Sequence, residues 1–149
     1  MIRQFQAEDA QYCSELIQAC IDRDPQVSAA LREKLVRAES PQTMISRARL
    51  FYLAVHDSKE GILGVGGLDL NEVRLLYVSP DHQGKGIGSA LLAHLESMVP
   101  PSLFADVFVY STFAAVNFYR SHGFAPDGEF AFDFEGEQLI TVFMTKSIR

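Results

Sequence analysis

The spacing of hydrophobic residues predicts helices in the first third of the chain. Apolar side chains recur at helical intervals over 10–21 on one face, and a second helical pattern covers 27–38. Ser40 followed by Pro41 supplies an N-cap and a proline at the first helical position, so a further short helix is expected to run to about Arg49. These helices precede the part of the chain that carries the recognisable motifs.

Runs of apolar residues bounded by turn residues predict strands in the rest of the chain. The three central runs are joined by short turns and favour an antiparallel meander, and the last two favour a closing hairpin. Two more helices are expected, one from Ile87 to Met98 and one around Phe118. The predicted strands cover residues 2–5, 51–56, 62–68, 72–78, 103–109, 130–134 and 139–145.

A glycine-rich turn follows the strand predicted at 72–78 and leads directly into the next helix. Gly84, Gly86 and Gly88 lack a Cβ, so the backbone can approach a ligand closely. The first N–H groups of the following helix have no intrahelical partner and can face an anion. This arrangement predicts a phosphate site, and a pyrophosphate is the expected ligand.

The spacing of the glycines excludes two common phosphate loops. The P-loop pattern G-x-x-x-x-G-K-[ST] is absent, because position 79 is serine. The dinucleotide pattern G-x-G-x-x-G also fails, because Ser89 or Leu91 would have to be glycine. What remains is Q-x-x-G-x-G over residues 83–88. On its own, such a turn is also compatible with a tight strand-to-helix connection.

A second segment, STFAAVNFYRSHGF at 111–124, contains the pattern A-x-x-F-Y followed by G-F. Its matching residues are Ala115, Phe118, Tyr119, Gly123 and Phe124. Together and in this order, the two segments resemble the Gcn5-related N-acetyltransferases (GNAT), and the resemblance extends over essentially the whole chain. It implies an α/β (α+β) fold with a mixed, mostly antiparallel central sheet of about seven strands and helices on both faces. A single N-acetyltransferase domain over 1–149 is expected, which is an ordinary domain size.

The resemblance implies acetyl-CoA as the cofactor. The backbone at Tyr77 and Val78 is expected to pair with the pantetheine arm, where the fourth strand diverges from the fifth, often at a β-bulge, and leaves an open edge. Lys85 would add charge beside the phosphates; a solvent-exposed lysine is the alternative. The main-chain amides assigned to the pyrophosphate are those of Gln83, Gly84, Lys85, Gly86, Ile87, Gly88 and Ser89.

The resemblance also suggests the catalytic residues. Tyr119 is the predicted general acid, because a phenol with a pKa of about 10 can protonate a thiolate whose conjugate acid has a pKa of about 8.5; a core tyrosine with a bonded hydroxyl is the alternative. Glu72 is the predicted base, at a fourth-strand position where some family members have a catalytic carboxylate; a solvated glutamate is the alternative. Thr112 replaces a common asparagine near the cofactor, and Asn117 or Ser111 is expected to substitute for it.

Composition narrows the partners. The net charge of −6, from 13 basic and 19 acidic residues, leaves no basic stripe for a nucleic acid. No apolar run approaches the roughly 18 residues of a membrane span, and no signal peptide is visible.

Cys13 and Cys20 lie about 10 Å apart along a helix, too far for a disulfide, which favours a reducing cytoplasm. They also lack the context of an acyl relay, so direct transfer in a ternary complex is expected. The four histidines show no metal-ligand spacing, so no metal site is predicted.

An acidic stretch without Lys or Arg lies between Arg120 and Lys146, and it contains Asp127, Glu129, Asp133, Glu135 and Glu137. It is compatible with a solvated hairpin rim or with a mouth that attracts a cationic acceptor. The acceptor is expected to be a primary amine of a small molecule or peptide. Two alternatives remain open, a transferase that uses another acyl-CoA and a non-catalytic acyl-CoA-binding sensor or interaction module. A homodimer is compatible with the fold.

Overall fold

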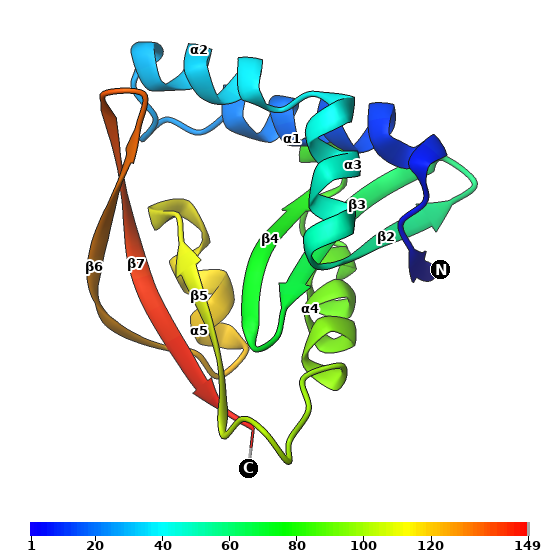
Figure 1. The fold of residues 1–149 in the computed structure, drawn as a ribbon, viewed down its shortest axis with the longest axis vertical. Coiled ribbons are helices and arrows are strands. Elements are labelled where there is room, and N and C mark those ends of the chain that lie inside the picture. The colour runs from blue at the N-terminus through cyan, green and yellow to red at the C-terminus, as the bar shows by residue number, and fades with distance from the viewer. Residues whose placement is uncertain (149) are drawn as a thin grey trace.

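The computed structural model describes residues 1–148, and their strands form one seven-stranded sheet (Figure 1). The strand order is β1-β2-β3-β4-β5-β7-β6, and every neighbouring pair in this part of the chain is antiparallel except β4–β5. The predicted fold class is confirmed. The strands are β1 (Ile2–Gln4), β2 (Tyr52–Ser58), β3 (Gly61–Asp69), β4 (Glu72–Val78), β5 (Asp106–Ser111), β6 (Ala125–Phe134) and β7 (Glu137–Ser147). The helices are α1 (Ala10–Asp22), α2 (Ala29–Ala38), α3 (Pro41–Leu50), α4 (Ile87–Ser97) and α5 (Val116–Ser121).

The first helices begin at the capping residues that the sequence contains. Ser40 Oγ accepts the N–H of Thr43 at 3.1 Å, and Pro41 occupies the first turn of α3. Helix α2 begins at Ala29, two residues later than the predicted range of 27–38, because Ser28 caps it. These caps fix where the chain turns between α1, α2 and α3.

The predicted ranges of β5, β6 and β7 differ most from the structure. The sequence places β5 at 103–109, whereas the strand begins at Asp106, because the chain first turns after Pro100 and its carbonyl accepts the N–H groups of Leu103 and Phe104 at 3.1 Å. Both strands of the closing hairpin are longer than predicted: β6 begins at Ala125 and not at 130, and β7 runs from Glu137 to Ser147 and not from 139 to 145. The hairpin turns at Glu135 and Gly136, which both have positive φ.

Helices pack on both faces of the sheet. On one face, Ile17 of α1 and Met44 of α3 belong to a core cluster with Val65 of β3. On the other face, Leu91 of α4 packs with Ala54 of β2. Figure 1 shows α3 in front of the sheet and α5 behind β5. The N-terminal helices and the two motif helices therefore lie on opposite sides of the sheet.

Strand β4 changes its phase at a β-bulge. The β3–β4 register pairs Gly67 with Leu75 and Leu68 with Val73, so Arg74 is an extra residue on β4. Residues two apart on a regular strand share a face. Because of the bulge, Val73 and Leu75 face opposite sides of the sheet. Val73 belongs to the core cluster of α4 and α5, and Leu75 belongs to the core cluster of α1.

Gly64 allows β3 to approach α4 closely. A Cβ at Gly64 would stand 2.7 Å from Leu91 Cδ1 and 3.3 Å from the carbonyl oxygen of Tyr77. We expect Gly64→Ala to lower the free energy of unfolding by about 1–3 kcal/mol through overpacking, measured by urea denaturation. In a double-mutant cycle with Leu91→Ala, the double variant should be less destabilised than the sum of the single variants. Additive effects would show that contact with Leu91 is not the cause.

Candidate active site

A cleft opens where β4 and β5 separate. Within residues 1–148, the two strands pair only between Glu72 and Phe108 and between Val73 and Val109, and they diverge beyond the bulge. A cavity of about 780 Å³ lies in this gap, with walls from α1, β4, the glycine-rich turn, the start of α4, β5 and α5. The structure thus contains the open strand edge expected from the sequence.

The β3–β4 ladder decides which backbone groups face the cleft. The N–H of Ser79 donates to the carbonyl oxygen of Leu63 at 2.8 Å, and hydrogen-bonded pairs alternate along an antiparallel ladder. Tyr77 therefore directs its N–H and carbonyl toward β3, whereas Leu76 and Val78 direct theirs toward the cleft. The sequence assigned the pantetheine contact to the backbone of Tyr77 and Val78. The register agrees with Val78 and replaces Tyr77 by Leu76.

Two side chains donate to the Val78 carbonyl oxygen. Gln83 Nε2 and Cys20 Sγ each lie 3.2 Å from it. Cys20 lines the cavity, whereas Cys13 is buried in the core. Burial raises the pKa of Cys20 to about 11 and that of Cys13 to about 12, so both are neutral thiols at pH 7. Since the thiolate is the nucleophilic form, neither cysteine is suited to an acyl relay.

The glycine-rich turn presents bare backbone to the cavity. Gly84 has a φ of 78° and Gly86 a φ of 86°, and a Cβ at either position would meet nothing within 4 Å. The N–H of Ala90 donates to the carbonyl of Gly86 at 3.0 Å, so the N–H groups of the three preceding helical residues have no intrahelical acceptor. The 11-residue helix α4 thus directs its positive end and free N–H groups toward the open side of the turn.

Helix α5 braces the start of α4. A Cβ at Gly88 would stand 3.2 Å from the Phe118 ring, so this glycine allows the two helices to pack closely. His122 Nδ1 lies 2.8 Å from the Phe118 carbonyl oxygen, and its Nε2 lies 2.8 Å from Ser89 Oγ. Because a carbonyl can only accept, Nδ1 is the donor in that bond, and Nε2 is the ring atom hydrogen-bonded to Ser89 Oγ. The Ser89 hydroxyl is therefore engaged, and its backbone N–H remains available.

Two tyrosine side chains line the cavity and keep free hydroxyls. Within residues 1–148, neither the Tyr77 nor the Tyr119 hydroxyl makes a hydrogen bond to protein. Burial raises the pKa of Tyr77 to about 12 and raises that of Tyr119 well above its usual value, and the nearby Tyr77 phenol adds to the shift of Tyr119. Both phenols therefore stay protonated at neutral pH and can donate a hydrogen bond. Tyr119 does not match the alternative of a core tyrosine with a bonded hydroxyl.

Glu72 is not among the described residues that line the cavity. It begins β4, next to Val73 and Arg74, which do line it. Desolvation raises the pKa of Glu72, and the Arg74 guanidinium, 4.0 Å away, opposes this rise. A raised pKa suits a general base, but the structure does not bring Glu72 to the same wall as Tyr119, so its role stays a prediction.

Two predicted cofactor residues also lie outside the cavity lining. Lys85 and Asn117 are exposed, and neither lines the cavity in the described part of the chain. Thr112 and Ser111 line it instead, but the Ser111 hydroxyl donates to the Thr112 carbonyl oxygen at 2.7 Å. Of the three residues considered for the cofactor contact, Ser111, Thr112 and Asn117, Thr112 is the one that lines the cavity with a hydroxyl free of protein partners in the described chain.

Glu39 is a cavity residue that the sequence motifs do not indicate. It is buried, and its two carboxylate oxygens accept from Arg47 Nη1 and Nη2 at 2.7 and 2.6 Å. The pair forms because α3 folds back after the short turn that follows α2, which no local pattern reveals. It places a neutralised carboxylate near the Tyr77 phenol at the floor of the cavity.

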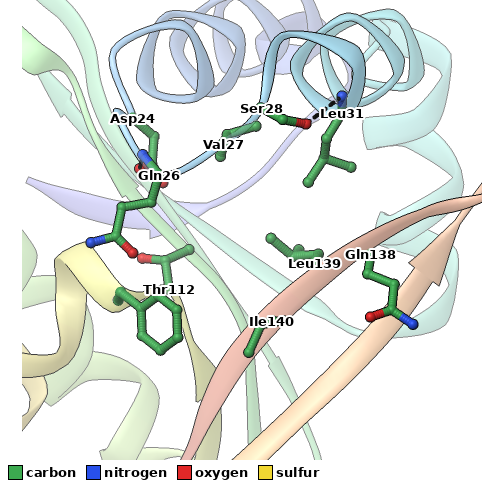
Figure 2. A pocket seen from close by; sticks show the side chains of 10 residues that line it. Asp24, Gln26, Val27, Ser28, Leu31, Thr112, Gln138, Leu139 and Ile140 are labelled. Atoms are coloured by element: carbon green, nitrogen blue, oxygen red, sulfur yellow. Dashed lines mark hydrogen bonds between the residues drawn. The ribbon is translucent and has the colours of Figure 1, made fainter.

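A smaller cavity of about 160 Å³ adjoins the first. The loop between α1 and α2 forms one side of it, and the start of β7 forms the other (Figure 2). The two cavities share four lining residues, Asp24, Val27, Thr112 and Leu139, so they are contiguous. The N-terminal helices and the closing hairpin thus meet beside the cleft.

The acidic stretch lies outside both cavities. None of its five carboxylate residues is among the described lining residues. Strand alternation places Glu129 and Asp133 on the face of β6 opposite Phe130 and Phe132, and Glu137 lies 3.9 Å from Lys34 of α2. This placement favours the solvated rim over a mouth that attracts a cationic acceptor.

The fold and the cleft agree with a match between the sequence and a protein-family model. Residues 9–147 match the family model of the acetyltransferase (GNAT) domain, and the chain belongs to this family of acetyltransferases. A search of curated proteins gave no significant match. Within residues 1–148, none of the helices has the length and apolar character that a membrane crossing requires.

Several solved structures share the fold. A GCN5-related N-acetyltransferase from Rhodopseudomonas palustris is 22% identical with a TM-score of 0.89, covering 99% of this chain and 95% of that one. The PaiA N-acetyltransferase of Thermoplasma acidophilum, solved with coenzyme A, is 18% identical with a TM-score of 0.79 and coverages of 99% and 98%. A phosphinothricin acetyltransferase from Sinorhizobium meliloti, solved with acetyl-CoA, is 21% identical with a TM-score of 0.71 and coverages of 99% and 87%. At these identities the likeness shows the fold.

The Glu39–Arg47 pair at the cavity floor should matter for stability. We expect Arg47→Met to lower the free energy of unfolding by about 3–5 kcal/mol, because it leaves a buried carboxylate unpaired, and urea denaturation would measure this. The double variant Glu39→Leu/Arg47→Met should recover most of the loss. As a control, Arg37→Met removes an exposed pair with Glu33 at 3.8 Å and should change stability by less than about 1 kcal/mol. A double variant as unstable as Arg47→Met would assign the loss to packing by Arg47.

Proposed function

We propose that this protein is an acetyl-CoA-dependent N-acetyltransferase that transfers the acetyl group directly to a primary amine of a small molecule or peptide. The observation that carries the proposal is the continuous path from the open edge of β4 to the free N–H groups of α4, with the Tyr119 hydroxyl on the same cavity. A strand edge, an anion site and a proton donor are the three parts that a bound thioester requires. Relatives of the same fold solved with coenzyme A or acetyl-CoA support this assignment.

The residues present fit coenzyme A. The N–H groups of Leu76 and Val78 and the carbonyl of Leu76 face the cleft and would pair with the pantetheine arm as an added strand does, whereas the Val78 carbonyl already accepts from Gln83 and Cys20. The bare backbone at Gly84 and Gly86 leaves space where a Cβ would otherwise stand, and the N–H groups at the start of α4 would hold the pyrophosphate. Arg23, also on the cavity, is available to add positive charge at this end, although it lies 3.3 Å from Asp81.

When bound, acetyl-CoA supplies an activated acetyl thioester. Tyr119 would protonate the departing thiolate, because burial keeps the phenol neutral and its hydroxyl has no competing partner in the described chain. A backbone N–H of the open β4 edge would polarise the thioester carbonyl. The attacking amine must lose a proton, and Glu72 is the proposed base, acting across the bulge through water, since desolvation raises its pKa.

A non-catalytic acyl-CoA-binding module would need only the anion site and the strand edge. The Tyr119 hydroxyl favours the enzyme, because this residue lines the cavity and its hydroxyl makes no hydrogen bond in the described chain, so it is available to a bound ligand. Another acyl-CoA would place a longer acyl group at the acceptor end. Glu39 is neutralised by Arg47 at the cavity floor, so this pair supplies no free cation for an anionic acyl group.

Gly86→Asp tests the cofactor site. A carboxylate at this position would face the pyrophosphate, so we expect the dissociation constant of CoA to rise by at least roughly 100-fold, measured by calorimetry. Gly61→Asp is the matched control, because Gly61 also has a positive φ and open space around it but begins β3, directly after the β2–β3 turn. The control should share any backbone strain and keep CoA affinity. Wild-type affinity in a folded Gly86→Asp protein would remove the pyrophosphate assignment.

Tyr119→Phe tests catalysis separately from binding. Loss of the hydroxyl should lower kcat by roughly 10²–10⁴-fold while CoA affinity changes little. The wild-type rate should rise with pH as the amine loses its proton and should decline only above a pH of about 10, since burial raises the pKa of the Tyr119 phenol above that value. The Phe variant should lack this decline. An unchanged kcat would end the general-acid assignment, and CoA binding without any activity in the wild type would favour the binding module.

A further inference from the structure

The junction of the two cavities carries a carboxylate without an ion-pair partner. Asp24 lines both cavities, and within residues 1–148 it forms no salt bridge. The other charged residues of the larger cavity are paired, since Glu39 binds Arg47 and Arg74 lies 3.0 Å from Asp69. Arg23 and His82, toward the glycine-rich turn, also face carboxylates. Asp24 is therefore the one charged residue of the described lining that forms no salt bridge, and the nearby Arg32 guanidinium bonds its backbone carbonyl and not its carboxylate.

The loop that carries Asp24 is held in place. Arg32 Nη2 donates to the carbonyl oxygens of Asp24 and Val27 at 3.0 and 2.9 Å. Asp24 Oδ1 accepts the backbone N–H of Gln26 at 2.9 Å, which closes a local turn and leaves the other carboxylate oxygen without a protein donor. The carboxylate is thus fixed at the junction before any ligand arrives.

Beyond Asp24, the smaller cavity is lined by five apolar residues and by four polar ones, Gln26, Ser28, Thr112 and Gln138. Its apolar lining consists of Val27, Leu31, Phe113, Leu139 and Ile140. Figure 2 shows Leu31 and Leu139 directed toward the space between the α1–α2 loop and β7. An enclosed, entirely apolar cavity of about 150 Å³ holds a benzene molecule, which gives the volume that one ring requires. The volume of about 160 Å³ found here therefore matches a six-membered ring.

We infer that the acceptor is a monoamine with an apolar, ring-sized tail, whose amino group is held by Asp24 and whose tail fills the smaller cavity. This inference rests on the proposed function and names its substrate class. The carboxylate recognises the ammonium form and positions the nitrogen at the entrance to the larger cavity, while the apolar walls accept the tail. Among the described residues that line the smaller cavity, Asp24 is the only charged one. A tail with a carboxylate or phosphate would therefore find no cation there.

A panel of amines tests the class. With acetyl-CoA and free-thiol release as the readout, kcat/KM for 2-phenylethylamine should exceed that for ethylamine by roughly 10- to 200-fold, as expected for burying one ring. Spermidine and glutamate should be poor acceptors. If spermidine or glutamate is the best acceptor, the inference is wrong while the proposed function stands. If no amine releases thiol from a protein that binds CoA, the proposed function fails, and the inference fails with it.

Variants of the two lining features locate the site. Leu139→Trp fills the smaller cavity and should raise KM for 2-phenylethylamine at least about tenfold, clearly more than it raises KM for ethylamine, which has no tail to place there. Asp24→Asn keeps the Oδ1 acceptor for Gln26 but removes the charge, and it should raise KM about tenfold with a small effect on kcat. The matched control Asp22→Asn removes an exposed charge outside both cavities and should change neither constant. Unchanged KM in both Leu139→Trp and Asp24→Asn would overturn the inference.

Discussion

The separation of β4 from β5 is the constraint on which the rest of the structure depends. It follows from one extra residue, Arg74, in the ladder between β3 and β4. Before the bulge, β4 pairs with β5 and Val73 faces α4 and α5. After it, the strand has changed phase, and Leu75 and Tyr77 face α1 while Leu76 and Val78 present backbone to the cleft. A regular strand would have continued the pairing with β5 and closed the cavity.

The cavity wall carries groups that favour opposite charges. At the glycine-rich turn, the free N–H groups and positive dipole end of α4 favour an anion. Where the smaller cavity joins, the carboxylate of Asp24 favours a cation, and Glu39 adds little because Arg47 compensates its charge. The phenols of Tyr77 and Tyr119 line the same cavity, and burial keeps them protonated. These groups would suit a phosphate-bearing donor and an amine acceptor bound in one cleft.

The sequence predicts the fold and the glycine-rich turn before α4 well, because both depend on local patterns. Glycines at 84 and 86, followed at once by an amphipathic helix, specify the turn wherever it lies in the fold. The β3–β4 register is harder to predict, because nothing in residues 72–78 shows that Arg74 is the bulged residue. The predicted backbone contact with the pantetheine arm therefore includes Tyr77, whereas the register favours Leu76. Glu39 and Arg47 were missed because their contact depends on how α3 returns against α2.

The sequence contains a signal about the acidic stretch that bears on the acceptor. Alternation along 129–133 places the acidic residues and the phenylalanines on opposite faces of β6, so a strand pattern alone argues that the carboxylates do not share one surface with the aromatic side chains. The importance of Asp24 could not be found in this way. It depends on the meeting of the α1–α2 loop with β7, two segments more than a hundred residues apart in the chain.

The two halves of the site are built by different kinds of groups, and this has a consequence for specificity. The proposed cofactor half would use main-chain groups of Leu76, Val78 and the start of α4, which change little when side chains are substituted. The proposed acceptor half would use side chains, and Arg32 holds its loop by two hydrogen bonds, which would reduce the conformational cost of binding. Substitutions in the loop or in β7 can therefore alter which amine binds while the cofactor site keeps its geometry. That separation explains how one cleft can retain its chemistry while its acceptor changes.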